Sequence, residues 1–211
     1  GSMARSRASA KKAGTSFETE MSRYLSERTG IPVTRRAKTG AVDLGDLTGV
    51  THQGREIAVE CKSPGRNSSW SISGWWKETE TEAENLGAPF GILLVRRYRK
   101  SIAQSLVVVD DHAAEALKAT TMLNVVEKKA HPFKELAEEL ITGDIIRTPR
   151  RGTKESWWMT TIEDILPLLD NAEDHGVIYL SDDDLSAIRE DGQVIKPDTT
   201  GGVVVVRYQS S

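Results

Sequence analysis

The sequence predicts an α/β protein whose core is a central mixed β-sheet flanked by helices, followed by a small α+β C-terminal extension. Residues 89–97 and 105–110 are short, continuous apolar runs, which are typical of buried sheet strands. Segments with the apolar spacing of helices alternate with these runs, as they do in α/β sheets. A chain of 211 residues is long enough for one domain and a smaller unit. We therefore expect the core to span residues 15–120 and the extension to span residues 121–211.

Composition and charge exclude several classes of protein. The chain is 38% apolar and 28% charged, has no apolar run near the roughly 18 residues of a membrane span, and shows no signal-peptide pattern. Its net charge of −3 argues against indiscriminate coating of nucleic acid, although local basic clusters remain compatible with phosphate binding. Cys61 is the single cysteine, so no internal disulfide can form, and the four histidines lack the spacing of a structural zinc site. We expect a protein of the reducing cytoplasm.

The first helix is predicted over residues 17–28, where apolar residues recur at helical spacing. Residues 1–14 are small and basic without such spacing, so we expect a disordered basic arm that begins with a tag remnant. Thr15 and Glu18 match a capping box at the start of the helix. Alternatively, Glu18 projects from the helix and supplies an acidic group to a functional site, and the two roles are compatible.

A β-hairpin is predicted next, with one strand over residues 47–50 and a second over residues 56–62. A turn containing glycine separates the two segments. Side chains on a strand point alternately to its two faces. Glu60 and Lys62 should therefore share one face, and Cys61 should point away from them into the interior.

Acidic residues converge at this hairpin. Asp46 stands at the mouth of the first strand, where it can approach Glu60 and Lys62. Two carboxylates near one point supply the oxygen ligands that a hard divalent cation prefers, and a lysine beside them can orient or activate a water molecule. Asp43, three residues earlier, could be confused with Asp46, which we prefer because it directly precedes the strand.

The other elements are read from the same periodicities. Trp75 and Trp76 are adjacent on a predicted helix, so one should pack in the core and the other lie at its edge. The predicted helices cover residues 71–86, 111–119, 132–141 and 161–169, the last interrupted at Pro167, and further strands cover residues 157–160, 177–180 and 203–208.

Glu18, Asp46, Glu60 and Lys62 stand in the order of a known pattern. The segments SFETEMSRYL, GDLTG, IAVECKS and SGWWKETETEAENLGAPFGILLVRR carry it. The chain resembles the PD-(D/E)XK nuclease superfamily, specifically the archaeal-type Holliday junction resolvases and their actinobacteriophage relatives, over roughly residues 15–120. The resemblance implies a restriction-endonuclease-like core. Gly45 replaces the motif proline before Asp46, a change that we expect the chemistry to survive, because proline there shapes the turn.

The resemblance also implies metal-dependent hydrolysis of phosphodiester bonds. Asp46 and Glu60 would hold one or two Mg²⁺ ions together with the backbone carbonyl of Cys61, and Mn²⁺ would substitute. Lys62 would position the attacking water or stabilise the phosphate in the transition state. Glu18 would hold a second metal directly or through water.

The implied partner is branched DNA, bound by a homodimer without a nucleotide cofactor, in the host cytoplasm if the protein is encoded by a phage. The residues expected to contact phosphates are Arg35, Arg36, Lys38 and Arg66. One alternative is another nuclease of this superfamily, restriction-like or acting on DNA ends. A second is a non-catalytic module that binds DNA or protein on the same fold.

Overall fold

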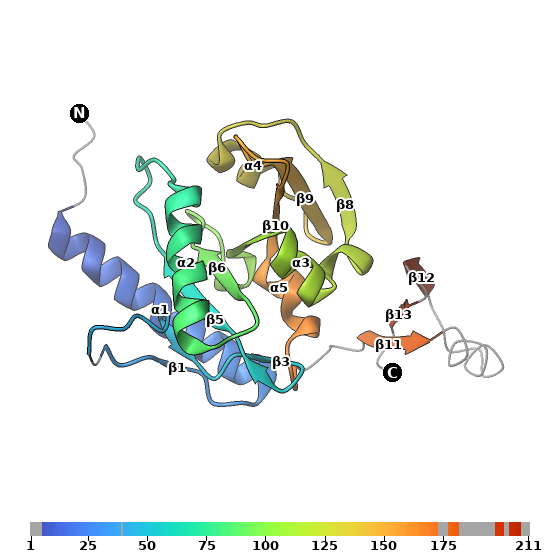
Figure 1. The fold of residues 1–211 in the computed structure, drawn as a ribbon, viewed down its shortest axis with the longest axis horizontal. Coiled ribbons are helices and arrows are strands. Elements are labelled where there is room, and N and C mark those ends of the chain that lie inside the picture. The colour runs from blue at the N-terminus through green and yellow to red at the C-terminus, as the bar shows by residue number, and fades with distance from the viewer. Residues whose placement is uncertain (1–5, 39, 173–176, 182–196, 201–202, 208–211) are drawn as a thin grey trace.

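A six-stranded mixed β-sheet forms the centre of the computed structural model, which describes residues 6–38, 40–172, 177–181, 197–200 and 203–207. The strand order is β5-β6-β7-β10-β9-β8, with parallel pairing of β5 with β6 and of β8 with β9, and antiparallel pairing elsewhere (Figure 1). The predicted fold class, a restriction-endonuclease-like α/β core with a mixed sheet flanked by helices, is confirmed. The strands are β5 (Ala58–Lys62), β6 (Gly91–Val95), β7 (Leu106–Asp110), β8 (Asn124–Glu127), β9 (Asp144–Pro149) and β10 (Ser156–Thr161).

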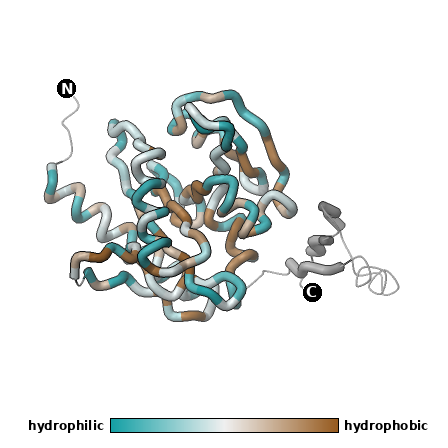
Figure 2. Tube along the Cα trace, in the orientation of Figure 1, coloured by the Kyte–Doolittle hydropathy of each residue, from teal (hydrophilic) through white to brown (hydrophobic). Residues whose placement is uncertain are grey.

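Helices pack against this sheet and close its core. Both α1 (Arg7–Thr29) and α2 (Ile72–Leu86) contact β5, the edge strand that carries the predicted site (Figure 1). Apolar residues run through the central strands, as Figure 2 shows, and the side chains of β6 are all buried. The other helices are α3 (Asp111–Leu117), α4 (Phe133–Glu139) and α5 (Ile162–Ile165), with 3₁₀ turns at η1 (Ile102–Gln104), η2 (Ala119–Thr121) and η3 (Leu166–Leu168).

The first helix is longer than predicted. It begins at Arg7, with the hydroxyl of Ser6 accepting a hydrogen bond from the N–H of Ser9, so part of the expected disordered arm is helical. Alanine and lysine dominate this first stretch, and both have high helix propensity even without an apolar stripe. The prediction of a capping box at Thr15 was wrong, because Thr15 lies within the helix. Glu18 is therefore not a capping residue.

The predicted hairpin is divided into shorter pairings. β1 (Thr34–Arg35) pairs with β2 (Leu47–Thr48), and β3 (Thr51–His52) pairs with β4 (Arg55–Glu56). Gly49 separates β2 from β3: its φ is +99°, and a Cβ there would clash with the carbonyl oxygen of Pro32. The two predicted strands still lie together, because the N–H of Ile57 donates to the carbonyl of Val50 at 3.0 Å.

The sheet continues past residue 120, where the sequence predicted the end of the core. β10 pairs with β7, so that Trp157 lies opposite Asp110, and β9 and β8 extend the same sheet. Trp76 is buried and its ring meets Trp157 edge to face, whereas Trp75 lies at the edge of the core, as predicted. Residues as far as β10 therefore share one sheet.

A separate three-stranded sheet follows towards the C-terminal end. Its order is β11-β13-β12, from β11 (Val177–Ser181), β12 (Pro197–Thr200) and β13 (Val203–Arg207). The strands predicted over residues 177–180 and 203–207 are confirmed, and residue 208 lies outside the described part of the chain. Among the described residues, none of the helices combines the length and the apolar character of a membrane span.

Candidate active site

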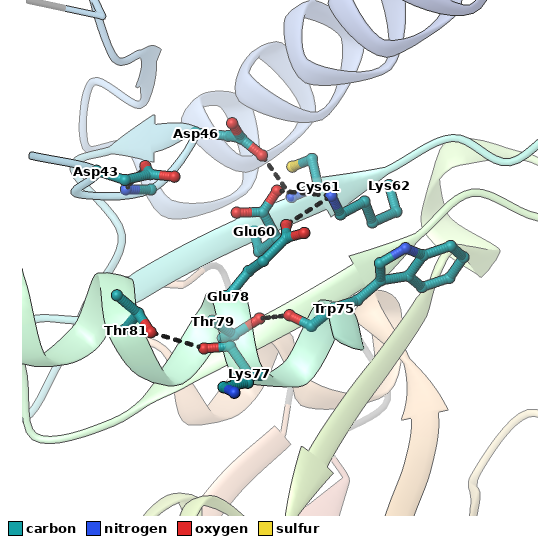
Figure 3. A network of polar contacts seen from close by, with 11 residues as sticks. Asp43, Asp46, Glu60, Cys61, Lys62, Trp75, Lys77, Glu78, Thr79 and Thr81 are labelled. Atoms are coloured by element: carbon teal, nitrogen blue, oxygen red, sulfur yellow. Dashed lines mark hydrogen bonds and ion pairs between the residues drawn. The ribbon is translucent and has the colours of Figure 1, made fainter. Parts of the chain in front are cut away.

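Asp46 is fixed against β5 by two backbone hydrogen bonds. Its own N–H donates to the carbonyl of Val59 at 2.8 Å, and its Oδ2 accepts the N–H of Cys61 at 2.8 Å (Figure 3). The second contact orients the carboxylate towards the strand that carries Glu60. Asp46 therefore has a defined direction before any ligand binds.

Glu60 and Lys62 share one face of β5, as the alternation of the strand predicted. Cys61 between them is buried in the core. Lys62 Nζ lies 3.6 Å from Glu60 Oε1 and 2.7 Å from Oε2 of Glu78, which projects from α2 (Figure 3). The sequence analysis missed Glu78, because its role depends on how α2 lies beside β5.

Glu18 reaches the same place from α1. Its side chain is only 16% exposed, and Arg35 Nε donates to its Oε2 at 3.0 Å. Burial raises the pKa of Glu18, and the nearby charge of Asp46 raises it further. The structure thus brings together Glu18, Asp46, Glu60 and Lys62 from three separate segments.

Glu82 of α2 is a further acidic residue of the site, and the sequence analysis missed it. The residue is 1% exposed, and neither of its oxygens accepts a hydrogen bond from an N–H or hydroxyl group in the described part of the chain. Carboxylate oxygens of Asp43, Glu60 and Glu82 all lie within 4.8 Å of one another. A signal existed: Glu82 lies three residues after Thr79 on the buried face of α2, where a carboxylate is uncommon.

The buried carboxylates hold more negative charge than their surroundings favour. Burial raises the pKa of Glu60, as do the neighbouring carboxyl group of Glu82 and the charge of Asp46. Burial also raises the pKa of Glu82, to about 7, although the neighbouring carboxyl group of Glu60 lowers it. Such a group of oxygens takes up a proton or a cation.

Gly45 gives the turn before Asp46 a shape that proline cannot adopt. Its φ is +101°, whereas proline is fixed near −65°. Its N–H donates to Asp43 Oδ1 at 3.1 Å, a bond that proline could not form. A Cβ at this position would lie 3.1 Å from the carbonyl oxygen of Val59 and 3.6 Å from Glu82 Oε2. The absence of the motif proline is therefore explained by the positive φ of the turn and by its close approach to the backbone of Val59.

The basic residues expected to contact DNA have different environments. Arg36 Nη2 lies 2.7 Å from Glu56 Oε1, and its buried Nε has no hydrogen-bond partner among the residues that the structure describes, which indicates a structural role. Lys38 and Arg66 are exposed, and the Arg66 guanidinium lies 5.0 Å from the centre of the Tyr98 ring. Arg35, paired with Glu18, stands closest to the carboxylates.

One comparison with known proteins assigns the family. The family described as "Phage putative PDDEXK endonuclease" matches residues 9–145, more than half of the chain, and the match includes Glu18, Asp46, Glu60, Lys62 and Glu82. No curated protein and no solved structure matches the chain. With four carboxylates and a lysine at the edge of its mixed sheet, the chain belongs to this family of phage PDDEXK endonucleases.

Proposed function

We propose that this protein is a metal-dependent endonuclease that hydrolyses phosphodiester bonds in branched DNA, as Holliday junction resolvases do. The observation that carries the proposal is the convergence of Glu18, Asp46 and Glu60 beside Lys62, on a member of an endonuclease family. Nothing in the packing of an edge strand requires a buried glutamate next to a lysine. A catalytic role explains this arrangement better than a purely structural one.

The donor set fits a hard divalent cation. The groups are oxygens, and buried Glu82 has no donor of its own in the described part of the chain. We infer that Asp46, Glu60 and the backbone carbonyl of Cys61 would hold Mg²⁺, with Mn²⁺ as a substitute and Glu18 close enough to act directly or through water. The bound ion would supply charge stabilisation at the phosphate and would lower the pKa of a bound water.

Lys62 acts as a cation in this proposal. Burial lowers the pKa of its ammonium group, but the hydrogen bond that it donates to Glu78 and the charge of Glu60 outweigh burial, and the net shift is upward. One N–H of the ammonium group donates to Glu78 Oε2 at 2.7 Å, and the ion pair with Glu60 Oε1 at 3.6 Å is longer than a hydrogen bond, so N–H groups remain for a phosphate oxygen or for the attacking water. A protonated lysine positions and stabilises, so it is not the general base.

DNA would approach over the exposed basic residues. Lys38 and Arg66 present charge to solvent near the two ends of the segment that carries Asp46 and Glu60. Arg35 would contact a phosphate near the carboxylates while it keeps Glu18 oriented. Because the protein is acidic overall, these residues would supply local attraction.

The branched substrate and a homodimer that cuts two strands symmetrically rest on the resemblance to resolvases. A dimer with two-fold symmetry would present two equivalent sites to a four-way junction. A restriction-like or end-processing nuclease would use the same chemistry on another substrate.

The test is cleavage of a synthetic four-way junction, a flap and a linear duplex of matched sequence, in Mg²⁺, in Mn²⁺ and in EDTA. We expect metal-dependent, paired nicks in the junction and little cleavage of the duplex. The Asp46→Asn variant should bind the junction and leave it uncut. Preferential cleavage of the linear duplex would reject the branched substrate, and equal results for the wild type and the variant would reject the site.

A further inference from the structure

Asp43, Glu60 and Glu82, which we call the α2-side cluster, form an oxygen cage of the size that a divalent cation needs. One carboxylate oxygen from each residue lies within 4.8 Å of the others. Ligand oxygens at about 2.1 Å from Mg²⁺ lie roughly 3 to 4 Å apart, and those around Ca²⁺ lie up to about 5 Å apart. Small side-chain rotations would bring the three groups onto one ion.

Glu82 is what distinguishes this cluster from a chance gathering of acids. It is 1% exposed, and neither oxygen accepts a hydrogen bond from any N–H or hydroxyl group of the described residues. The lysine of the site, Lys62, pairs with Glu60 and Glu78. A buried carboxylate without a donor is unfavourable by several kcal/mol unless something else neutralises it.

The backbone around the cluster is arranged to keep it open and in place. Asn85, one turn after Glu82 on α2, donates to the carbonyl of Asp43 at 2.9 Å and ties that loop to the helix. Gly45 donates to Asp43 Oδ1 and leaves the space beside Glu82 Oε2 without a side chain. A pocket of about 200 Å³ is lined by Asp43, Lys77 and Thr81, so the cluster borders it through Asp43.

We propose that the α2-side cluster holds a second divalent cation, separate from the position that Asp46 and Glu60 would hold on the α1 side, with Glu60 contributing to both. The proposal deepens the proposed function, on which its catalytic meaning rests: two cations that share one carboxylate could bind both the attacking and the leaving oxygen of a phosphodiester. Hard cations such as Mg²⁺ and Mn²⁺ suit three carboxylates.

The experiment is a titration of the metal-free full-length chain with MnCl₂, with unbound Mn²⁺ measured by its electron paramagnetic resonance signal. We expect two ions per chain for the wild type and one for Glu82→Gln. Glu84→Gln, the same change at an exposed position of α2, is the matched control and should retain two. Asp43→Asn, at an exposed residue, provides a second variant and should weaken the second ion at least about tenfold.

Folding is checked in the same samples by thermal denaturation without metal. Added Mn²⁺ should raise the Tm of the wild type more than that of Glu82→Gln, because one binding event is lost. The proposal is overturned if folded Glu82→Gln and Asp43→Asn bind both ions as the wild type does, or if the wild type binds fewer than two. Protein that binds two ions as expected but cuts no DNA would reject the proposed function and leave this inference standing.

Discussion

The two sides of Glu60 differ in how their carboxylates are held. On the α1 side, Asp46 accepts the backbone N–H of Cys61 and Glu18 accepts the guanidinium of Arg35. On the α2 side, Glu82 is more deeply buried than either and has no donor among the described residues. Both sides belong to the same small region of the molecule, yet only the α2 side contains a buried carboxylate without an N–H donor among the described residues.

The difference indicates which groups are positioned by the protein and which depend on a ligand. A carboxylate held by donors keeps its direction in the metal-free state and is ready to bind. A buried carboxylate without donors is stabilised only when a proton or a cation arrives. We infer that the α1 side is preorganised and that the α2 side is completed by binding.

Glu60 belongs to both sides, so its removal should have the largest effect. Glu60→Gln keeps the size of the side chain but removes the charge shared by the two positions. We expect DNA cleavage to fall by about 10³-fold or more, of the order seen when a principal electrostatic group is lost, and Mn²⁺ binding to weaken at both positions. Single-turnover cleavage and the Mn²⁺ titration measure the two effects, and Glu84→Gln is the control.

Lys62→Ala should be next in size. Removal of the ammonium takes away one positive charge beside the phosphate while leaving the carboxylates, so cleavage should fall about 10²-fold with Mn²⁺ binding retained or tightened. A loss of bound ions in Lys62→Ala equal to that in Glu60→Gln would mean that the lysine supports the cluster instead of the reaction.

Glu78→Gln should have a smaller effect with a distinct pH signature. Glu78 raises the pKa of Lys62 by its hydrogen bond, so its loss should lower that pKa. Activity that needs protonated Lys62 would then disappear at a lower pH on the alkaline side of the pH–rate profile. A uniform loss of rate with an unmoved alkaline limb would contradict this positioning role.

The pH dependence of the free energy of unfolding of the metal-free protein should show the effect of Glu82, the buried carboxylate on the α2 side. The pKa of Glu82 is raised from 4.5 to about 7, so the folded state keeps a proton that the unfolded state releases, and stability falls as the pH rises through this window. Glu82→Gln removes the titrating group and with it this fall in stability at high pH. We expect the variant to be about 1–3 kcal/mol more stable than the wild type at pH 8 and nearly equal at pH 4. Urea unfolding in EDTA measures the difference, and equal stability at both pH values would mean that Glu82 is already satisfied.

Arg35→Ala should produce the smallest change. It removes the guanidinium donor of Glu18, so that the α1 side, like the α2 side, would contain a carboxylate without its donor. The side chain of Arg35 is 46% exposed, so solvent screens its ion pair with Glu18. We expect Mn²⁺ to bind the α1 side about two- to fivefold more tightly without DNA, as a competing cation is removed. Weaker binding in the variant would show that Arg35 orients Glu18 more than it competes for it.

The part of the site that lies on one strand could be predicted from the sequence. The period of two in β5 places Glu60 and Lys62 together, and the spacing from Asp46 limits where that residue can lie. Glu78 and Glu82 could not be predicted, because their roles depend on the packing of α2 against β5. The shape of the Gly45 turn was missed for the same reason, since the glycine accommodates the backbone of β5 at Val59.

In the fold, too, elements with a local sequence signal were predicted, and those that depend on long-range pairing were not. The buried strands β6 and β7 were visible as apolar runs, whereas β8 is largely exposed at the sheet edge and carries little apolar signal. The core was therefore expected to end at residue 120, before β8. Pairing of β10 with β7 is a long-range contact that local periodicity does not contain.

The central claim is that Glu60 lies between two cation positions, one on each side. Crystals of the metal-free protein soaked in Mn²⁺ would test it directly, because manganese gives anomalous scattering that locates each ion. We predict two anomalous peaks that share Glu60 as a ligand, one beside Asp46 and one between Asp43 and Glu82. A single peak, or none within coordination distance of Glu82, would contradict the account.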